Sequence, residues 1–255
     1  MARLFSLEGK VALVTGASSG LGVQFATALA KQGADVALLA RRKEKLEKVK
    51  ADLEALGVKA LAVECDVTDV KQIKDAVKEV KDHFGKIDIL VNNAGIGFMA
   101  PAEEQSDEDW LKTVDINLNG VYFVAREVGK IMVEQKYGKV INIGSIHSTA
   151  AMMGSGISAY AATKGGVKML TKALATEWAQ YNITVNTIGP AYFASEMTQD
   201  VVSDKSFEAV VKTYCPMGRI GQEGELDGAI VYFASDASSY TTGQYLAVDG
   251  GWTAI

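Results

Sequence analysis

Val11-Ala-Leu-Val-Thr15-Gly16-Ala-Ser-Ser-Gly20-Leu-Gly22 is the stretch that decides the fold of this chain. Its first five residues form a short apolar run of the kind that is buried on both faces of a parallel sheet. Three glycines follow, and a helical pattern then continues to Gly33. The order strand, glycine turn, helix predicts the first unit of an α/β fold.

The glycine turn also predicts a binding site. Glycines let the backbone approach a pyrophosphate, and the N-terminus of the next helix offers free N–H groups to it. The spacing Gly-x-x-x-Gly-x-Gly differs from the commoner G-x-G-x-x-G. Three glycines in a loop are also often a turn that binds no ligand. Their place between a first strand and a helix favours a dinucleotide site. The expected contacts are Gly16, Ser18, Ser19, Gly20, Leu21 and Gly22.

The end of the next predicted strand, residues 35–39, bears on the choice of cofactor. In dinucleotide folds an acid here holds the ribose 2′-hydroxyl, whereas an arginine accommodates a 2′-phosphate. This chain has Ala40-Arg41-Arg42 and no acid. A clasp by Arg41 and Arg42 favours NADP(H) over NAD(H), which stays possible. The alternative is two solvated arginines that open a helix.

Strand and helix patterns alternate along the rest of the chain. Strands are expected at 60–64, 87–91, 139–143, 183–188 and 245–248, and helices at 43–56, 70–84, from 106 onward, around 160, and at 223–234. Residues 196–221 break the periodicity and predict a mobile segment of short helices. We therefore expect one Rossmann-type domain over residues 1–255, with a substrate flap at 191–221 inside it.

Composition narrows the function classes. The chain has 255 residues, 48% of them hydrophobic, and a net charge of −5 spread along the chain, which argues against a nucleic-acid partner. No apolar run reaches the ~18 residues needed to cross a bilayer, and no signal peptide opens the chain. Cys65 and Cys215 are therefore expected to be reduced thiols in a cytoplasmic protein. Two histidines and two scattered cysteines predict no metal site.

Tyr160-Ala-Ala-Thr-Lys164 is the strongest candidate for catalysis. Its helix-favouring residues and the spacing of four place phenol and ammonium on one helical face. The positive charge favours the phenolate, so we expect it to lower the pKa of Tyr160 toward the working pH of an acid/base catalyst. Alone, such a pair also fits a solvated helix surface.

Small and polar residues follow several predicted strands, at the edge where open α/β sheets bind ligands. Asp66 and Val67 follow the third strand, and Asp66 is a candidate acceptor for the adenine amino group. Asn93, Ala94 and Gly95 follow the fourth, and Ser145 follows the fifth. Asn117 lies inside a predicted helix, where a buried asparagine needs a specific reason.

Taken in order, these motifs resemble the short-chain dehydrogenase/reductase family along essentially the whole chain. The matching pieces are Thr15-Gly-Ala-Ser-Ser-Gly-Leu-Gly22, Asn92-Asn-Ala-Gly95, Asn117, Ser145, Tyr160-x-x-x-Lys164, and Asn186 with Pro190. The resemblance implies seven parallel strands flanked by helices on both faces, a nicotinamide cofactor and commonly a homotetramer.

The resemblance also implies roles for individual residues. Tyr160 would be the acid/base, and Ser145 would steady the substrate oxygen. Lys164 would lower the phenol pKa and grip the nicotinamide ribose, and Asn117 would complete a water-linked proton path. The main chain of Phe193 and the side chain of Ser195, which follow Pro190, would hold the carboxamide.

Two positions depart from the family pattern. Ser145 lies 15 residues before Tyr160 (160 − 145), about two more than usual, and the usual spacing points to His147. Ser145 is preferred because it directly follows a strand, and Ser148 is in reserve. Pro190-Ala191 replaces Pro-Gly, so the turn needs a backbone that alanine tolerates or carries strain.

The candidates for contact with the substrate are a histidine, a tyrosine and a set of apolar residues. His147 would titrate near the substrate carbonyl or, alternatively, donate to backbone carbonyls of its own loop. Tyr192 is expected at the mouth. The mouth would be apolar and adaptable, lined by Met152, Met153, Ile157, Tyr192, Phe193, Met197 and Met217.

Within the family, Pro190-Ala-Tyr-Phe-Ala-Ser-Glu-Met-Thr198 and Val248-Asp-Gly-Gly251 look similar to the gluconate 5-dehydrogenase group. This similarity implies an alcohol–ketone interconversion on a sugar acid or polyol. A hydroxysteroid dehydrogenase and a 3-oxoacyl-carrier-protein reductase are the alternatives, although no basic patch for an acidic carrier is visible. A non-catalytic dinucleotide-binding regulator is a remote alternative, because both Tyr160 and Lys164 are present.

Overall fold

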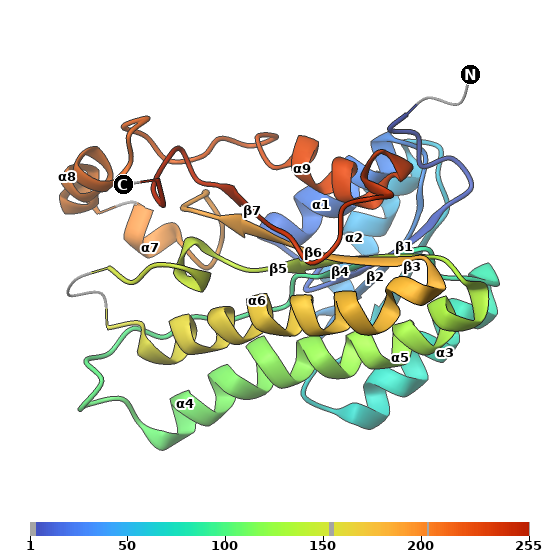
Figure 1. Cartoon of the computed structure of the whole chain (residues 1–255), viewed down its shortest axis with the longest axis horizontal. Helices are drawn as coiled ribbons and strands as arrows, with labels where there is room; N and C mark the ends of the chain where they lie inside the picture. Colours follow the sequence, from blue (N-terminus) through green and yellow to red (C-terminus); the bar gives the residue numbers. More distant parts are fainter. Residues whose placement is uncertain (1–3, 153–155, 203, 255) are drawn as a thin grey trace.

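A seven-stranded parallel sheet forms the centre of the molecule in this computed structural model, which describes residues 4–152, 156–202 and 204–254. The strand order is β3-β2-β1-β4-β5-β6-β7 (Figure 1). The strands are β1 Val11–Thr15, β2 Asp35–Ala40, β3 Ala60–Glu64, β4 Ile89–Asn92, β5 Gly138–Ile143, β6 Ile183–Pro190 and β7 Tyr245–Val248. The predicted fold class is confirmed.

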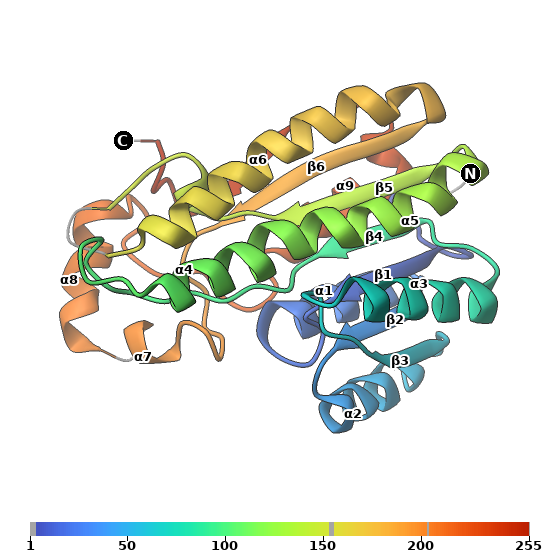
Figure 2. The ribbon, with the colours of Figure 1, turned by 90° about the horizontal axis from the view of Figure 1, so that it is seen from below.

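Helices cover both faces of the sheet, as expected. One face carries α1 Gly20–Lys31, α2 Lys43–Glu54 and α9 Asp227–Ala234. The other carries α3 Val70–Phe84, α4 Asp107–Val114, α5 Val121–Gln135 and α6 Ser158–Trp178, which lie side by side in Figure 2. None of the helices in the described ranges combines the length and hydropathy that a membrane span requires.

Strand β1 shows why the first apolar run has no alternation. Ala12 and Val14 pack into the core beneath α1 and α9, whereas Leu13 packs into the core beneath α3 and α5. All three side chains have no solvent exposure. A strand covered on both sides must be apolar at every position, which is the pattern that the sequence shows.

Local signals set several element boundaries. Asp69 begins α3 by accepting hydrogen bonds from the N–H groups of Lys71 and Gln72, and Gly85 ends it with a left-handed backbone. Ser106 begins α4 by accepting from the N–H of Asp109. Each of these side chains satisfies a backbone group that the helix itself leaves unpaired. The predicted bounds of α3 and the predicted start of α4 are confirmed.

Two of the boundaries that differ from the sequence expectation have a clear local cause. The last helix begins at Asp227 rather than at residue 223, because Gly224 has a φ of +88° and the Glu225 carboxylate accepts the N–H of Gln222. These contacts make a turn where a helix was expected. The fourth strand begins at Ile89 rather than at residue 87, since the N–H of Ile87 bonds the side chain of Gln135 instead of a neighbouring strand.

The flap (residues 191–221) lies beyond the carboxyl end of β6. It contains two short helices, α7 Gln199–Val202 and α8 Lys205–Tyr214, at the end of the molecule where Figure 1 shows the carboxyl ends of the strands. The strand order reverses between β1 and β4, which connect to opposite halves of the sheet. In open α/β sheets a ligand crevice forms at such a switch point.

Candidate active site

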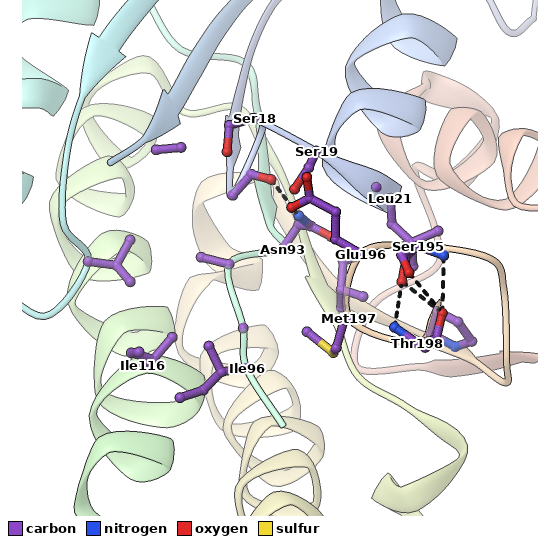
Figure 3. A pocket seen from close by; sticks show the side chains of 18 of the residues that line it. Ser18, Ser19, Leu21, Asn93, Ile96, Ile116, Ser195, Glu196, Met197 and Thr198 are labelled. Atoms are coloured by element: carbon purple, nitrogen blue, oxygen red, sulfur yellow. Dashed lines mark hydrogen bonds between the residues drawn. The ribbon is translucent and has the colours of Figure 1, made fainter. Parts of the chain in front are cut away.

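A cavity of about 260 Å³ opens at the switch point (Figure 3). Its walls come from the glycine turn, the ends of β2 to β5, the start of α6 and the flap. Of the predicted cofactor contacts, all except Gly22 line it: Gly16, Ser18, Ser19, Gly20, Leu21, Arg41, Arg42, Asp66, Val67, Asn93, Ala94, Gly95, Tyr160, Lys164, Pro190, Phe193 and Ser195. Ser145 lines it too, whereas Asn117, His147 and Tyr192 do not.

Gly22 does not line the cavity, but close packing explains why this position is a glycine. A Cβ atom built on it would lie 2.2 Å from the carbonyl oxygen of Gly16. Gly16 itself has a φ of +64°, and its Cβ would lie 2.8 Å from the Cα of Ala94. The turn therefore closes so tightly that only glycine fits, and it leaves its backbone open toward the cavity. This shape suits a bound pyrophosphate at the start of α1.

Thr15 and Asn93 join β1 to β4 at the edge of the cavity. The Thr15 hydroxyl oxygen accepts the N–H groups of Asn93 and Ala94 at 3.0 and 3.1 Å. In return the Asn93 amide donates to the carbonyl oxygens of Thr15 and Gly16 at 3.1 and 3.3 Å. Asn93 therefore fixes the glycine turn. It can do so because its amide is a hydrogen-bond donor and because it directly follows β4, next to the turn.

Arg42 forms the basic corner of the cavity. Its Nε and one terminal nitrogen donate to the Ser18 hydroxyl at 3.2 and 3.1 Å, and that terminal nitrogen also donates to Ser19 at 2.6 Å. The remaining nitrogen pairs with Glu196 of the flap at 2.9 Å. Arg41 is exposed and lines the same corner. The corner thus gathers hydroxyl and guanidinium donors suited to an oxyanion.

Asp66 lines the cavity, and its carboxylate also accepts hydrogen bonds within the turn that contains it. One oxygen accepts the N–H and the hydroxyl of Thr68 at 2.9 and 2.8 Å. These bonds fix the direction of the side chain at the end of β3. Its predicted contact with an adenine amino group stays a prediction.

Tyr160, Lys164 and Ser145 meet at the opposite end of the cavity. The first turns of α6 carry Tyr160 and Lys164, and Ser145 follows β5 directly, as the sequence predicted. The Ser145 hydroxyl hydrogen-bonds the Tyr160 phenol. The Lys164 ammonium donates to the carbonyl oxygen of Ile143 at 2.8 Å and lies 5.6 Å from the centre of the Tyr160 ring.

Burial controls the protonation of this pair. It raises the pKa of Tyr160, and the bond from Ser145 only partly opposes it. It also lowers the pKa of Lys164 to about 8. The expected lowering of the Tyr160 pKa is therefore wrong for these contacts, because loss of solvent disfavours the phenolate more than the nearby groups favour it. The Tyr160 phenol is therefore held in its protonated form.

Asn117 is fully buried in the π-helical segment Asp115–Gly120, between α4 and α5. Its side-chain oxygen accepts the N–H of Ile96 at 2.8 Å, and its amide donates to the Ile96 carbonyl at 2.8 Å. The burial of this asparagine is thus explained: its side chain fixes the irregular segment that follows Gly95, beside Lys164. Only the main chain of Asn117 remains for a proton path.

His147 and Tyr192 lie beside the cavity. The His147 ring contacts the Tyr160 ring edge-on, 6.2 Å between centres, and its Nδ1 pairs with the Ala150 carbonyl oxygen at 3.2 Å. Burial lowers the His147 pKa, so the ring is neutral near pH 7. Tyr192 packs against Phe207 and Trp252. The loop contact foreseen for His147 is present, and contact of either residue with substrate stays a prediction.

The two departures from the family pattern resolve differently. The extra length before Tyr160 forms a short 3₁₀ helix, Ile146–Ser148, which Ser145 begins by accepting the N–H of His147. The Ser148 hydroxyl oxygen accepts the N–H of Ser145 at 3.2 Å. Ala191 is not among the described residues with positive φ, so its turn uses a backbone that alanine tolerates.

The apolar mouth is only partly assembled at the cavity. Met197 and Phe193 line it, while Tyr192 and Met217 line a second cavity between the flap and residues 248–252. Met153 lies outside the described residues. No group of three or more possible metal ligands occurs within residues 4–152, 156–202 and 204–254.

Two flap residues near the cofactor end were missed from the sequence. Thr198 organises the turn that carries Ser195: its hydroxyl accepts the Ser195 N–H at 3.1 Å and donates to the Phe193 carbonyl. Glu196 reaches Arg42 and Lys45, which are more than 150 positions away. Only the three-dimensional fold brings these charges together, so no local pattern could have identified them.

Known proteins match this chain along nearly its whole length. A family model described as "Enoyl-(Acyl carrier protein) reductase" matches residues 16–253. Gluconate 5-dehydrogenase of Gluconobacter oxydans is 46% identical over 98% of this chain and 97% of its own. 5-keto-D-gluconate 5-reductase of Escherichia coli K12 is 41% identical over 97% of both chains.

A solved structure is equally similar. The gluconate 5-dehydrogenase from Burkholderia cenocepacia J2315, in complex with NADP and tartrate, superposes with a TM-score of 0.95 at 40% identity, covering 99% of this chain and 98% of that one. Together with the glycine turn and the Tyr160–Lys164 pair, these matches establish that the chain belongs to the short-chain dehydrogenase/reductase family of oxidoreductases.

Proposed function

We propose that this enzyme interconverts a sugar acid and its keto form, D-gluconate and 5-keto-D-gluconate, with NADP(H). The observation that carries the proposal is the near full-length identity to gluconate 5-dehydrogenase and 5-keto-D-gluconate 5-reductase, joined to a Ser145–Tyr160 pair at the end of the cavity. As an oxidoreductase of this family, the chain does not fit the alternative of a non-catalytic regulator.

Reduction of the ketone needs one hydride and one proton. A bound nicotinamide, held by Lys164, Phe193 and Ser195, would supply the hydride. As the hydride adds to the carbonyl carbon, negative charge develops on the oxygen, and the hydroxyls of Ser145 and Tyr160 stabilise it there. Tyr160 then transfers its proton to that oxygen, for which its raised pKa keeps it protonated. Oxidation of the alcohol runs the same steps in reverse.

Lys164 and Asn117 support these steps. The ammonium of Lys164 is fixed on the Ile143 carbonyl between the phenol and Gly95, where it can hold the nicotinamide ribose and favour the phenolate after proton transfer. Asn117 positions Ile96 at the wall of the same space. Its main chain would carry the proposed water-linked path from Lys164 to solvent.

The 2′-phosphate of NADP(H) would lie at the Arg42 corner. Arg42, Ser18 and Ser19 present donors within one cluster, and no acid stands at the end of β2. The related structure that contains NADP supports the same choice. The Gly16–Gly22 turn would receive the pyrophosphate, and Phe193 and Ser195 the carboxamide.

We also propose a homotetramer working in the cytoplasm. Four apolar side chains of α4, α5 and α6, helices that lie next to one another in Figure 2, are exposed: Trp110, Leu111, Tyr122 and Met169, at 42%, 59%, 40% and 64%. Such a face suits contact with another subunit. Cys65 and Cys215 are both free, which suits a reducing compartment. Sedimentation equilibrium should give four times the chain mass, and a monomer would contradict the assembly.

The position of oxidation tests the proposed substrate. Purified enzyme is incubated with D-gluconate and NADP⁺ together with a system that reoxidises the product cofactor, and the product is examined by ¹³C NMR. The proposal predicts a ketone at carbon 5. A ketone at another carbon, or no turnover of gluconate while a simple polyol is oxidised, would contradict it.

A further inference from the structure

The carboxylate of Glu196 occupies the basic corner from the flap side. It pairs with Arg42 at 2.9 Å and with Lys45 at 2.6 Å, and it also bonds the Ser19 hydroxyl. Figure 3 shows the Glu196 side chain pointing toward Ser19. The hydrogen bonds from Lys45, Arg42 and Ser19 lower the pKa of Glu196 to about 2, so it is an anion at every physiological pH.

These partners are the groups that a 2′-phosphate needs. Arg42 and Ser19 bond Glu196 directly, and Ser18 accepts hydrogen bonds from the same guanidinium. A phosphate and a carboxylate cannot both hold one cluster without like-charge repulsion. Resting on the proposed use of NADP(H), we propose that Glu196 sets the cofactor selectivity of this enzyme: it competes with the 2′-phosphate for Arg42, and it accepts the 2′-hydroxyl of NAD(H).

The second half of the proposal follows from the sequence around Arg42. Dinucleotide folds that use NAD(H) place an acid at the end of the second strand to accept the ribose 2′-hydroxyl. Here that position holds Ala40. Glu196 brings a carboxylate to the same corner from the flap, 156 positions later in the chain (196 − 40). The corner thus contains a phosphate clasp and a hydroxyl acceptor that exclude each other.

The flap holds Glu196 at this place. The turn from Ser195 to Thr198 is closed by bonds between their hydroxyls at 2.9 Å and from the Ser195 N–H to Thr198 at 3.1 Å. Ser195 also packs on the glycine turn, 3.1 Å from where a Cβ of Gly20 would lie. A bound 2′-phosphate therefore has to displace the Glu196 side chain from its two ion pairs, or move the turn with it.

The test compares binding of NADPH, NADH, 2′,5′-ADP and 5′-ADP to the wild type, Glu196→Gln and Glu47→Gln. Glu47 is the matched control: its side chain is also 50% exposed and pairs with a lysine of α2, but it does not line the cavity. Isothermal titration calorimetry measures all four dissociation constants without turnover. The smaller nucleotides confine the comparison to the adenosine end.

Glu196→Gln should tighten NADPH and 2′,5′-ADP by roughly three- to tenfold, the effect expected for losing one or two exposed ion pairs that compete with the ligand. It should weaken NADH and 5′-ADP, because a neutral amide accepts the 2′-hydroxyl less strongly than a carboxylate does, and Glu47→Gln should change none of the four by more than about twofold. Weaker NADPH binding, or equal tightening of NADPH and NADH, would overturn the role of Glu196. A wild type that binds NADH and not NADPH would instead overturn the proposed cofactor.

Discussion

Tyr160 is the residue on which the proposed chemistry depends. Its phenol bonds Ser145 and borders the cavity. Tyr160→Phe removes the proton donor and little else, so turnover should fall by about 10²–10⁴-fold, the usual contribution of general acid catalysis. NADPH affinity should stay within about twofold, because the ring is kept. Initial rates and a fluorescence titration of NADPH give the two values, and wild-type turnover in the variant would contradict the role of Tyr160.

Arg41 and Arg42 are adjacent, yet we expect them to contribute differently to the binding of the 2′-phosphate. Arg42 bonds Ser18 and Ser19, and Arg41 lines the same corner from an exposed position. Arg42→Ala should weaken NADPH by roughly 10- to 100-fold, as expected for the loss of charge-assisted hydrogen bonds, and NADH far less. Arg41→Ala is the matched control, with a smaller loss of NADPH affinity.

Titration of both cofactors against both variants checks this ranking. A larger effect of Arg41→Ala would move the phosphate contact to the neighbouring residue. If Arg42→Ala lowered the affinities for NADPH and NADH equally, Arg42 would stabilise the protein structure and would not bind the 2′-phosphate.

At the scale of elements, the π-helical segment Asp115–Gly120 fixes one wall of the site through Asn117. Asn117→Ala leaves the N–H and carbonyl of Ile96 without their partners, so the free energy of unfolding should fall by about 2–4 kcal/mol. Asn119→Ala, on the same segment and bonded to Asp115 near the surface, should cost less than about 1 kcal/mol. Urea denaturation measures both, and similar losses would mean that the clamp on Ile96 contributes little.

Much of each element could be predicted from local sequence. The bounds of α3 follow from Asp69 at its start and Gly85 at its end, and β1 follows from an apolar run with a glycine turn behind it. The late start of α9 could not, because it depends on how Glu225 bonds Arg219 and the Gln222 N–H in the folded chain. Helical periodicity alone cannot show such a turn.

Some features of the site could likewise be predicted from the sequence, and others could not. Ser145, Tyr160 and Lys164 stand at fixed places after β5 and on α6, so motif and strand order suffice to bring them together. The neutral state of His147 and the raised pKa of Tyr160 depend on burial, which has no sequence signature at these positions. The contact of Glu196 with Arg42 requires the flap to fold back over the glycine turn, which is a property of the whole chain.

At the scale of the whole molecule, burial of Lys164 makes stability depend on pH. Its pKa is about 8 in the folded chain and near its ordinary 10.5 when unfolded, so the unfolded state binds more protons between these values. Stability contributed at this position should therefore rise as pH increases from about 8 to about 10.5, by roughly 2–3 kcal/mol.

Lys164→Met removes this titration and serves as the reference. The difference in unfolding free energy between wild type and variant, measured by urea denaturation at pH 7.5 and pH 10, should shift in favour of the wild type at the higher pH. A difference that is independent of pH would mean that Lys164 keeps an ordinary pKa in the folded chain.

The measurement that tests the central claim most directly is a comparison of kcat/KM for ketone reduction. Purified enzyme is assayed with NADPH, and then with NADH, against 5-keto-D-gluconate, an oxo-steroid and an acetoacetyl thioester, which represent the three substrate classes that the sequence left open. The account predicts the highest kcat/KM for 5-keto-D-gluconate with NADPH, by about tenfold or more over the other pairs. A higher value for the steroid or the thioester would contradict the assignment as a sugar-acid oxidoreductase.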